Sequence, residues 1–366
     1  MKITGIETIP FRIALKKVTV WARGKQDAAE HVLVKVHTDA GITGIAEAPP
    51  RPTIYGESIA SIKFAIDKWL SPLVVGTDPF EIEKMWDKFD LIAANNTAKG
   101  AMDIALYDIM GKALGVPCYK LAGAFTNTVR LSWCVNLNPV EKMVEEGQEM
   151  MEKYGIRTMK LKVGIEPKKD LEMVKAMRHA LGDDVVLYVD ANQGYDPFTA
   201  VRMVEQMMDY NIVMIEEPCP VWDISGRQMV AARIPIPWMG DESCPTPPDA
   251  KRQIEAGARV ISIKTARTGF TQSRRIIHLC EVNGVRNVHG LQGDTGIGSI
   301  ASAHVCAGYK NTSFYYPSEA SFFLIMEDDL LQVPLVVKDG CLKLSDKPGL
   351  GVEIDEAKVR KYAIES

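Results

Sequence analysis

The stretch YVDANQGYDPFTAVRMVEQMMDYNIVMIEEP, residues 188–218, contains two apolar strands that each end in a carboxylate. Asp190 ends the first strand and Glu216 ends the second, with a helical stretch between them. A third apolar stretch, PWMGDES, ends at Asp241 in the same way. In a barrel of alternating strands and helices, neighbouring parallel strands lie about 5 Å apart, so carboxylates at equal heights converge. The sequence therefore predicts three acidic side chains gathered at one end of a parallel sheet.

Such a group of carboxylates indicates a metal site. Three buried anions repel one another strongly unless a cation lies between them. Hard oxygen ligands of this kind favour Mg²⁺, with Mn²⁺ as a possible substitute. We expect Asp190, Glu216 and Asp241 to be the ligands.

The composition indicates a globular protein rather than a nucleic-acid or membrane protein. The chain has 366 residues, of which 46% are hydrophobic and 25% charged, enough for a large core and a second domain. The net charge is -4 and no run of Lys or Arg exceeds a pair, so no nucleic-acid partner is expected. The first twenty residues carry several charges and no 18-residue apolar run occurs, which argues against a signal peptide and a membrane partner. Seven scattered cysteines without a C-x-x-C pair indicate a reducing compartment, the cytoplasm.

The first third of the chain predicts a separate α+β unit. Residues 1–50 alternate in polarity around a D-A-G turn, which indicates an antiparallel meander. Residues 59–121 change to helical periodicity, and Gly115 ends the last helix. We place this domain at residues 1–125. The short strands expected in KDGCLKLS and GLGVEI, within residues 326–366, would pack back on it as its last layer.

Residues 126–325 predict a barrel of the TIM type, (β/α)7-8. Eight apolar strands, from RLSWCVNL to TSFYYPSE, alternate with amphipathic helices. The polar residues at the strand ends recur every 23 to 30 residues, the length of one βα unit. They are Lys160, Asp190, Glu216, Asp241, Lys264 and His289.

Lysines in the predicted inner strands point to acid–base chemistry. In TMKLKVG, strand alternation places Lys160 and Lys162 on the inner face, where parallel strands are normally apolar. Lys264 in VISIKTA comes four strands later, so it would face Lys162 across the barrel mouth. This arrangement suits removal of a proton from the carbon next to a carboxylate, with Mg²⁺ holding the resulting enediolate. The base would need a pKa below the usual lysine value of about 10.4.

At these motifs the chain resembles the enolase superfamily, in its mandelate racemase and muconate-lactonizing subgroup. The resemblance rests on MKLKVG, VDANQG, IEEP, GDES and ISIKTART, with AKGAMDIALYDIMGKALGVPCYKLAG resembling the last helix of the family's capping domain. It implies metal ligands at Asp190, Glu216 and Asp241, an acid/base pair at Lys162 and Lys264, and an auxiliary lysine at Lys160. It also implies a small-molecule carboxylate substrate, and we expect a homo-oligomer.

Further polar residues are candidates for substrate binding. Asn192 matches a polar neighbour of the family's metal, and Asp294 and Glu319 stand where cycloisomerases carry acidic residues. The Asp-x-Asp pair by which dipeptide epimerases hold an α-ammonium is absent. His289 ends strand seven, but strand six carries Lys264 in place of an Asp, so a packing or substrate-contact role is favoured over a His/Asp dyad.

Two further sets of residues remain open. The loops of the first domain would cover the barrel mouth with Trp21, Arg23 and Tyr55, as substrate contacts or as ordinary surface residues. Glu217 and Glu242 follow the metal-ligand positions and are expected to point away from them in supporting roles.

The resulting hypothesis is a Mg²⁺-dependent enzyme that abstracts the α-proton of a carboxylate. Two opposed lysines favour, narrowly, a racemase or epimerase of a small amino-acid derivative, because one lysine removes the proton and the other returns it. Muconate-type cycloisomerisation comes next, followed by dehydration or a syn elimination of the o-succinylbenzoate synthase type. A non-catalytic binding barrel is disfavoured, because such a protein has no use for this set of buried charges.

Overall fold

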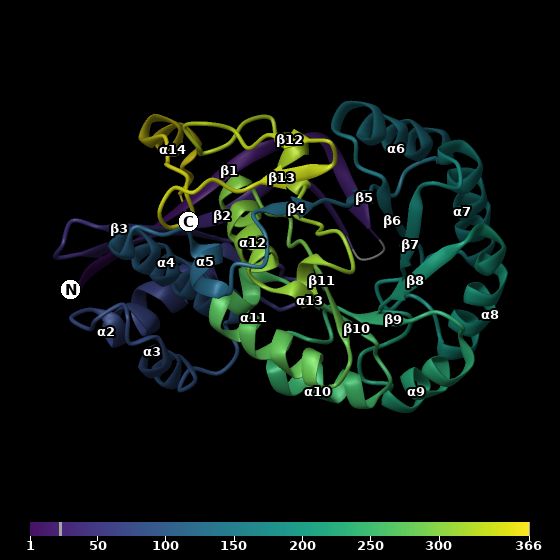
Figure 1. The fold of residues 1–366 in the computed structure, drawn as a ribbon, viewed down its shortest axis with the longest axis horizontal. Helices are drawn as coiled ribbons and strands as arrows, with labels where there is room; N and C mark the ends of the chain where they lie inside the picture. Colours follow the sequence, from purple (N-terminus) through teal and green to yellow (C-terminus); the bar gives the residue numbers. More distant parts are fainter. Residues whose placement is uncertain (22–23, 366) are drawn as a thin grey trace.

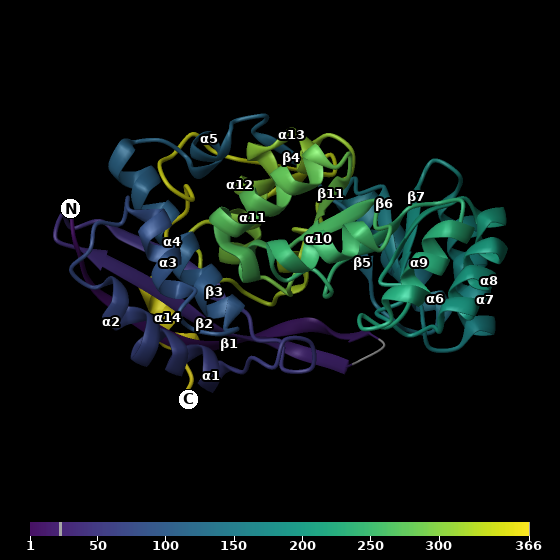
Figure 2. The same ribbon diagram turned by 90° about the horizontal axis from the view of Figure 1, so that it is seen from below.

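A three-stranded antiparallel sheet opens the chain and forms the base of the capping domain. The computed structural model describes residues 1–21 and 24–365. The sheet has the order β1-β2-β3, as the alternation predicted. Strands β1 and β2 pair along most of their length and extend toward the barrel (Figure 2). The strands are β1 (Ile3–Trp21), β2 (Gly24–Thr38) and β3 (Thr43–Ala48).

Helices cover this sheet over the region where helical periodicity was predicted. The longest, α4, has a C-cap at Gly115 with φ 70°, a conformation that glycine adopts without strain. Helix α4 packs on β3 and reaches helix α11 of the barrel (Figures 1 and 2). The helices are α1 (Ile59–Phe64), the π-helical turn η1 (Ala65–Leu70), α2 (Ser71–Val74), α3 (Ile82–Phe89), α4 (Asn96–Leu114) and α5 (Cys118–Ala122).

Seven parallel strands form the barrel sheet, in sequence order from β5 to β11. Helices α6 to α10 follow its outer side as an arc (Figure 1). The strands are β5 (Trp133–Val135), β6 (Thr158–Lys162), β7 (Val186–Asp190), β8 (Ile212–Glu216), β9 (Trp238–Gly240), β10 (Val260–Ile263) and β11 (Arg286–His289). The helices are α6 (Val140–Tyr154), α7 (Pro167–Leu181), α8 (Pro197–Met207), the turn η2 (Met208–Tyr210), α9 (Ile224–Arg233), α10 (Pro247–Glu255), α11 (Thr265–Val282), α12 (Gly296–Gly308) and α13 (Lys310–Ser313).

The predicted eighth strand, TSFYYPSE, is not a strand. Its start lies in the short helix α13, and only residues 318–319 join the sheet. The Ser318 N–H donates to the Arg130 carbonyl at 2.8 Å, and the Glu319 N–H donates to the His289 carbonyl at 2.7 Å. These two residues therefore connect β11 to the chain just before β5, the strands at the two edges of the curled sheet.

The C-terminal segment differs in part from the expectation. KDGCLKLS forms β12 (Val337–Lys338) and β13 (Cys341–Lys343), but β13 pairs with β4 (Thr128–Arg130) rather than with the capping sheet. GLGVEI is not a strand, because Gly349 and Gly351 have φ values of 68° and 69° that interrupt an extended chain. The chain returns to the capping domain at α14 (Glu356–Tyr362), which packs on β1. The 3-10 turn η3 (Phe322–Ile325) precedes the C-terminal segment.

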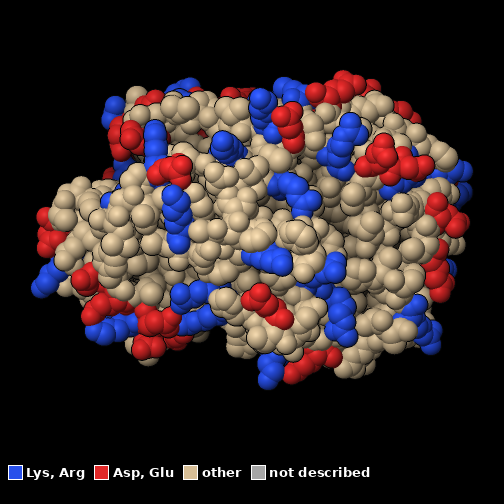
Figure 3. Space-filling view, in the orientation of Figure 1, with Lys and Arg blue, Asp and Glu red and all other residues tan. Residues whose placement is uncertain are grey.

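The described surface agrees with the mixed charge of the sequence. On the face shown in Figure 3, basic and acidic side chains are interspersed rather than gathered by sign. Among residues 1–21 and 24–365, no helix has the length and apolar character that crossing a membrane requires.

Candidate active site

Strand register brings the predicted residues together at the carboxyl ends of the barrel strands. Lys162 pairs with Asp190 across β6 and β7, and Asp190 pairs with Glu216 across β7 and β8. Asp241 directly follows β9, and Lys264 directly follows β10. Because side chains of parallel strands at equal heights point the same way, the acidic and basic groups form one interior layer.

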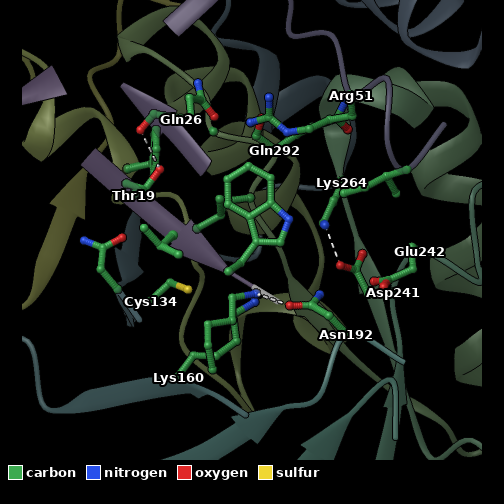
Figure 4. A pocket seen from close by; sticks show the side chains of 18 of the residues that line it. Thr19, Gln26, Arg51, Cys134, Lys160, Asn192, Asp241, Glu242, Lys264 and Gln292 are labelled. Atoms are coloured by element: carbon green, nitrogen blue, oxygen red, sulfur yellow. Dashed lines mark hydrogen bonds and ion pairs between the residues drawn. The ribbon is translucent and has the colours of Figure 1, made fainter. Parts of the chain in front are cut away.

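A pocket lies above this layer, between the barrel mouth and the capping domain. Its walls include Lys160, Lys162, Asp241 and Lys264 from the barrel, and Figure 4 shows Lys264 and Lys160 entering from different sides. The capping domain contributes residues of β1, β2 and the loop after β3. These residues are Thr19, Val20, Trp21, Gln26, Arg51, Ile54 and Tyr55.

The two outer lysines each pair with a carboxylate. Lys162 Nζ lies 2.6 Å from Asp190 Oδ2 and 3.0 Å from Asn192 Oδ1. Lys264 Nζ donates to Asp241 Oδ2. Burial lowers the pKa of each lysine, but the facing carboxylate outweighs it, so both pKa values lie above that of a free lysine. With these partners in place, the expected lowering of the base pKa is not found.

Lys160 lies deeper and contacts three carboxylates. Its Nζ is 2.7 Å from Glu319 Oε2, 3.1 Å from Glu216 Oε2 and 3.8 Å from Asp190 Oδ2. Burial lowers its pKa, while Glu216 and then Glu319 raise it, so that the pKa of Lys160 lies well above the usual lysine value. Lys160 is therefore held as a cation.

The carboxylates fit a divalent cation by their chemistry. Among the described residues, Glu216 Oε1 is buried without a hydrogen-bond partner, and Asp241 Oδ1 makes no hydrogen bond but lies 3.2 Å from Arg267 Nη1. Burial, followed by repulsion from Asp190, raises the pKa of Glu216 well above its usual value, a cost that a divalent cation would offset. Within the described residues, no three His, Cys, Asp or Glu side chains enclose a metal position as they stand. In their present rotamers the three carboxylates face lysines.

The remaining predicted residues divide into two groups. Asn192, Tyr55 and Trp21 line the pocket, and the Trp21 indole N–H is buried with no hydrogen-bond partner among the residues that the structure describes. Arg23 lies outside the described residues. The other three, Glu319, Asp294 and His289, are buried beside the pocket rather than in its wall.

The contacts of these last three residues explain their positions. Glu319 lies behind Lys160, and Asp294 Oδ2 accepts from the Gln292 N–H at 3.0 Å. His289 Nε2 lies 2.7 Å from Thr265 Oγ1, and burial lowers its pKa to about 3. His289 is thus buried and neutral, and its role in packing or substrate contact stays a prediction.

Several pocket residues were not predicted. Glu242 was expected to point away, yet it lines the pocket and accepts from Gln193 Nε2 at 3.0 Å. Strand β9 ends at Gly240, so alternation no longer sets the direction of Glu242. Arg51 and Gln292 come from loops, which carry no periodic signal. The arginine in PPRPT was the one available hint, because this segment was expected to cover the barrel mouth.

Glu217 has the expected supporting role. Its carboxylate accepts from the Asp241 N–H at 2.6 Å and the Ser243 N–H at 3.0 Å, and it pairs with the fully buried Arg227. Glu217 therefore holds the backbone at Asp241.

Comparison with known proteins places this geometry in a family. Residues 6–123 match the mandelate racemase / muconate lactonizing enzyme N-terminal domain, and residues 142–358 match the enolase C-terminal domain-like family. The chain belongs to the enolase superfamily. Within it, the matches support the mandelate racemase and muconate-lactonizing subgroup, and the barrel with its capping domain is the fold of this superfamily.

The relatives of this superfamily member are isomerases. A muconate lactonizing enzyme from M. smegmatis, solved with muconolactone, is 40% identical over 100% of both chains, with a TM-score of 0.98. A hydrophobic dipeptide epimerase from Enterococcus faecalis is 33% identical over 96% of this chain and 99% of its own. A dipeptide epimerase structure from that organism, complexed with Mg and L-Leu-L-Tyr, is 30% identical over 96% of this chain and 99% of its own, with a TM-score of 0.91. This chain is an isomerase of the enolase superfamily.

Proposed function

We propose that the protein is a Mg²⁺-dependent isomerase that moves the proton on the carbon next to a carboxylate. The observation that carries the proposal is that Lys162, on β6, and Lys264, after β10, line one pocket. Strands β7 and β8, which end at Asp190 and Glu216, and β9, which Asp241 follows, lie between them in the sheet. Two ammonium groups can thus approach a substrate carbon from different sides.

Each residue of the interior layer has a distinct part in the proposal. Asp190, Glu216 and Asp241 would hold the metal, and bound Mg²⁺ would supply positive charge that stabilises the negative charge building on the substrate carboxylate. Engagement of Asp190 and Asp241 would remove the partners that raise the pKa of Lys162 and Lys264. Lys160 contributes a fixed positive charge, and Asn192 positions Lys162 through their 3.0 Å contact.

The charge of the pocket favours a substrate with two acidic groups. Arg51, Lys162 and Lys264 line it, whereas Asp241 is a proposed metal ligand and Glu242 is bound by Gln193. Cationic side chains of the described wall thus outnumber Glu242, the acidic side chain there that is not a proposed metal ligand. We therefore favour cycloisomerisation of an unsaturated dicarboxylate over the racemisation that the sequence narrowly favoured, and the relative solved with muconolactone supports this order.

Racemisation of an N-acylated amino acid remains the second candidate. The relative that epimerises hydrophobic dipeptides supports it, because its reaction exchanges the proton at an α-carbon. The blocked nitrogen would avoid an ammonium group next to Arg51. The cytoplasmic location, the homo-oligomer and the domain limits 1–125, 126–325 and 326–366 stay predictions.

The test uses the Mg²⁺-loaded enzyme in D₂O with cis,cis-muconate, N-succinyl amino acids and dipeptides, followed by proton NMR. A cycloisomerase should convert muconate to a lactone with deuterium next to one carboxylate, whereas a racemase should place deuterium at the α-carbon of an acylated amino acid. Lys162→Ala and Lys264→Ala should each lower turnover by about 100-fold or more. The exposed Lys169, which pairs with Glu166, provides the control Lys169→Ala, which should keep full activity.

The lysine variants also separate the two reactions. In a racemase each variant should still exchange the α-proton of one enantiomer, because the remaining lysine faces it. In a cycloisomerase one lysine transfers the proton and the other stabilises charge, so no enantiomer-specific exchange should remain. Wild-type turnover in both lysine variants would refute the proposal.

A further inference from the structure

Tyr188 is a polar residue in an otherwise apolar part of the barrel interior. It lies on β7 two residues before Asp190, so both side chains point inward. The side chains packed with it at the centre of the barrel are Met214, Met239, Val260 and Val288. Packing alone would be satisfied by a phenylalanine at this position, which indicates that the hydroxyl has a separate role.

The hydroxyl of Tyr188 binds the carboxylate that holds Lys160. Tyr188 Oη donates to Glu319 Oε1 at 2.6 Å, while Glu319 Oε2 lies 2.7 Å from Lys160 Nζ. Lys160 and Tyr188 are also register partners on adjacent strands. Tyr188, Glu319 and Lys160 therefore form a chain of contacts that we call the Lys160 clamp.

The clamp favours Glu319 over the other carboxylates near Lys160 as the partner of its ammonium. Its ammonium also lies 3.1 Å from Glu216 Oε2 and 3.8 Å from Asp190 Oδ2, both proposed metal ligands. A lysine that moved closer to Glu216 would compete with a cation for that carboxylate. Glu319 oriented by Tyr188 instead offers Lys160 a carboxylate that is not a proposed ligand.

Without the hydrogen bond from Tyr188, Glu319 would be held mainly through its backbone. Its N–H donates to the His289 carbonyl at 2.7 Å, and its side chain has one further donor, the Leu291 N–H, at 3.3 Å from the Oε2 that faces Lys160. Tyr188 is the donor that binds the other oxygen, Oε1, among the described contacts. Without the phenol, the carboxylate can rotate away from Lys160.

We propose that Tyr188 is a positioning residue: through Glu319 it keeps the Lys160 ammonium, which also donates to Glu216, from moving closer to the metal-ligand carboxylates. The inference rests on the proposed function for its catalytic consequence. It has a second consequence, on Mg²⁺ affinity, that needs no substrate.

The chain offers a matched control for Tyr188→Phe. Tyr195 is equally buried and donates from its hydroxyl to Asp170 Oδ2 at 2.7 Å, and neither residue lines the pocket. Tyr195→Phe therefore removes the same hydroxyl and leaves a carboxylate oxygen without the same donor. Both variants should lower the melting temperature by a similar small amount.

The experiment measures Mg²⁺ binding by calorimetry for wild type and three variants. It also measures kcat and KM for each, on the substrate that the D₂O assay identifies. Tyr188→Phe should raise the Mg²⁺ Kd and lower kcat, each by about tenfold, with KM nearly unchanged. Glu319→Gln should change both in the same direction. Tyr195→Phe should leave Kd, kcat and KM at wild-type values.

The outcomes separate this inference from the proposed function. Wild-type Mg²⁺ affinity in Tyr188→Phe, or equal effects in Tyr188→Phe and Tyr195→Phe, would overturn the positioning role. Absence of Mg²⁺ binding by the wild-type protein would instead refute the proposed function on which the inference rests. A rise in KM alone would show that Tyr188 acts on substrate binding, which also contradicts the clamp.

Discussion

Two consecutive glutamates at the end of β8 show how position relative to a strand decides the role of a residue. Glu216 is the last residue of β8 and points to the interior layer with Asp190. Glu217 follows with φ 41° and binds Arg227 and the backbone at Asp241 and Ser243 instead. One residue thus belongs to the proposed metal site and the other supports it.

Arg227 is expected to be essential for stability. It is fully buried and donates to Glu217 and to four other groups, so its removal leaves a buried carboxylate without a counter-charge. Arg227→Met should lower the free energy of unfolding by about 3–5 kcal/mol, measured by urea denaturation. The double variant Glu217→Gln, Arg227→Met should recover part of that loss, because no charge is then left unpaired. A single variant that loses less than about 1 kcal/mol would contradict this account.

At the scale of elements, helix α4 ties the capping domain to the barrel beside Lys264. Gly100 of α4 approaches the backbone of α11 so closely that a Cβ would lie 2.6 Å from the Ala266 carbonyl oxygen. One turn later, Asp103 accepts from the Phe270 N–H at 2.6 Å and the Thr271 N–H at 3.0 Å. These N–H groups are free to bind Asp103 because helix α11 is interrupted at Gly269, with φ 57° and ψ −163°.

We expect Gly100→Ala to disturb both stability and activity. The added methyl group meets backbone atoms that cannot rotate away, so α4 or the first turn of α11 must move, at a cost of about 1–3 kcal/mol. Because Lys264 directly precedes α11, kcat should fall as well. The control is Gly5→Ala in β1, where a Cβ would have nothing within 4 Å. Thermal unfolding and turnover should be unchanged there, and equal effects of the two substitutions would argue against the close helix contact.

Elements with a regular period were predictable, and those without one were not. The seven barrel strands and their inward carboxylates follow from apolar runs and alternation, which continue only as far as the strand does. Glu242 and Arg51 lie beyond strand ends, where loop conformation and not period sets direction. TSFYYPSE has the composition of a strand, yet within it the backbone hydrogen bonds to the neighbouring chain are made at Ser318 and Glu319, at its end. The Tyr188–Glu319 contact joins residues 131 positions apart, which no local pattern reveals.

At the scale of the whole molecule, three parts of the chain meet at the start of α12. Glu47 of β3 accepts from the Thr295 N–H at 2.7 Å, and Asp329 of the C-terminal segment accepts from the Gly296 N–H at 2.8 Å. Asp294 and His31 are buried next to Glu47. Carboxylates from the capping domain and the C-terminal segment thus meet in one buried cluster at the N-terminus of a barrel helix, where N–H donors favour carboxylates.

This junction predicts a dependence of stability on pH. Burial raises the pKa of Glu47 to about 7 from 4.5, against hydrogen bonds from Thr295 that lower it. The folded protein therefore binds this proton more tightly than the unfolded chain. The contribution of Glu47 to stability is complete below about pH 4.5 and is lost as the pH rises through about 7. A pKa difference of about 2.5 corresponds to a loss of about 3 kcal/mol. His31 cannot compensate, because burial lowers its pKa to about 3 and it stays neutral in this range.

The measurement is the free energy of unfolding from pH 4.5 to 8 for wild type and Glu47→Gln. The glutamine cannot ionise but keeps an oxygen for the Thr295 donors, so the variant should lose less stability than wild type as the pH rises. Burial, then repulsion from Glu47, raises the pKa of Asp294 to about 6, so the variant should retain part of the slope through this second carboxyl group. The difference between the two curves, rather than either curve alone, therefore reports on Glu47. Parallel curves across the whole range would mean that Glu47 is ionised in the folded protein, and that the contact between the capping domain and α12 is a charged one at every pH tested.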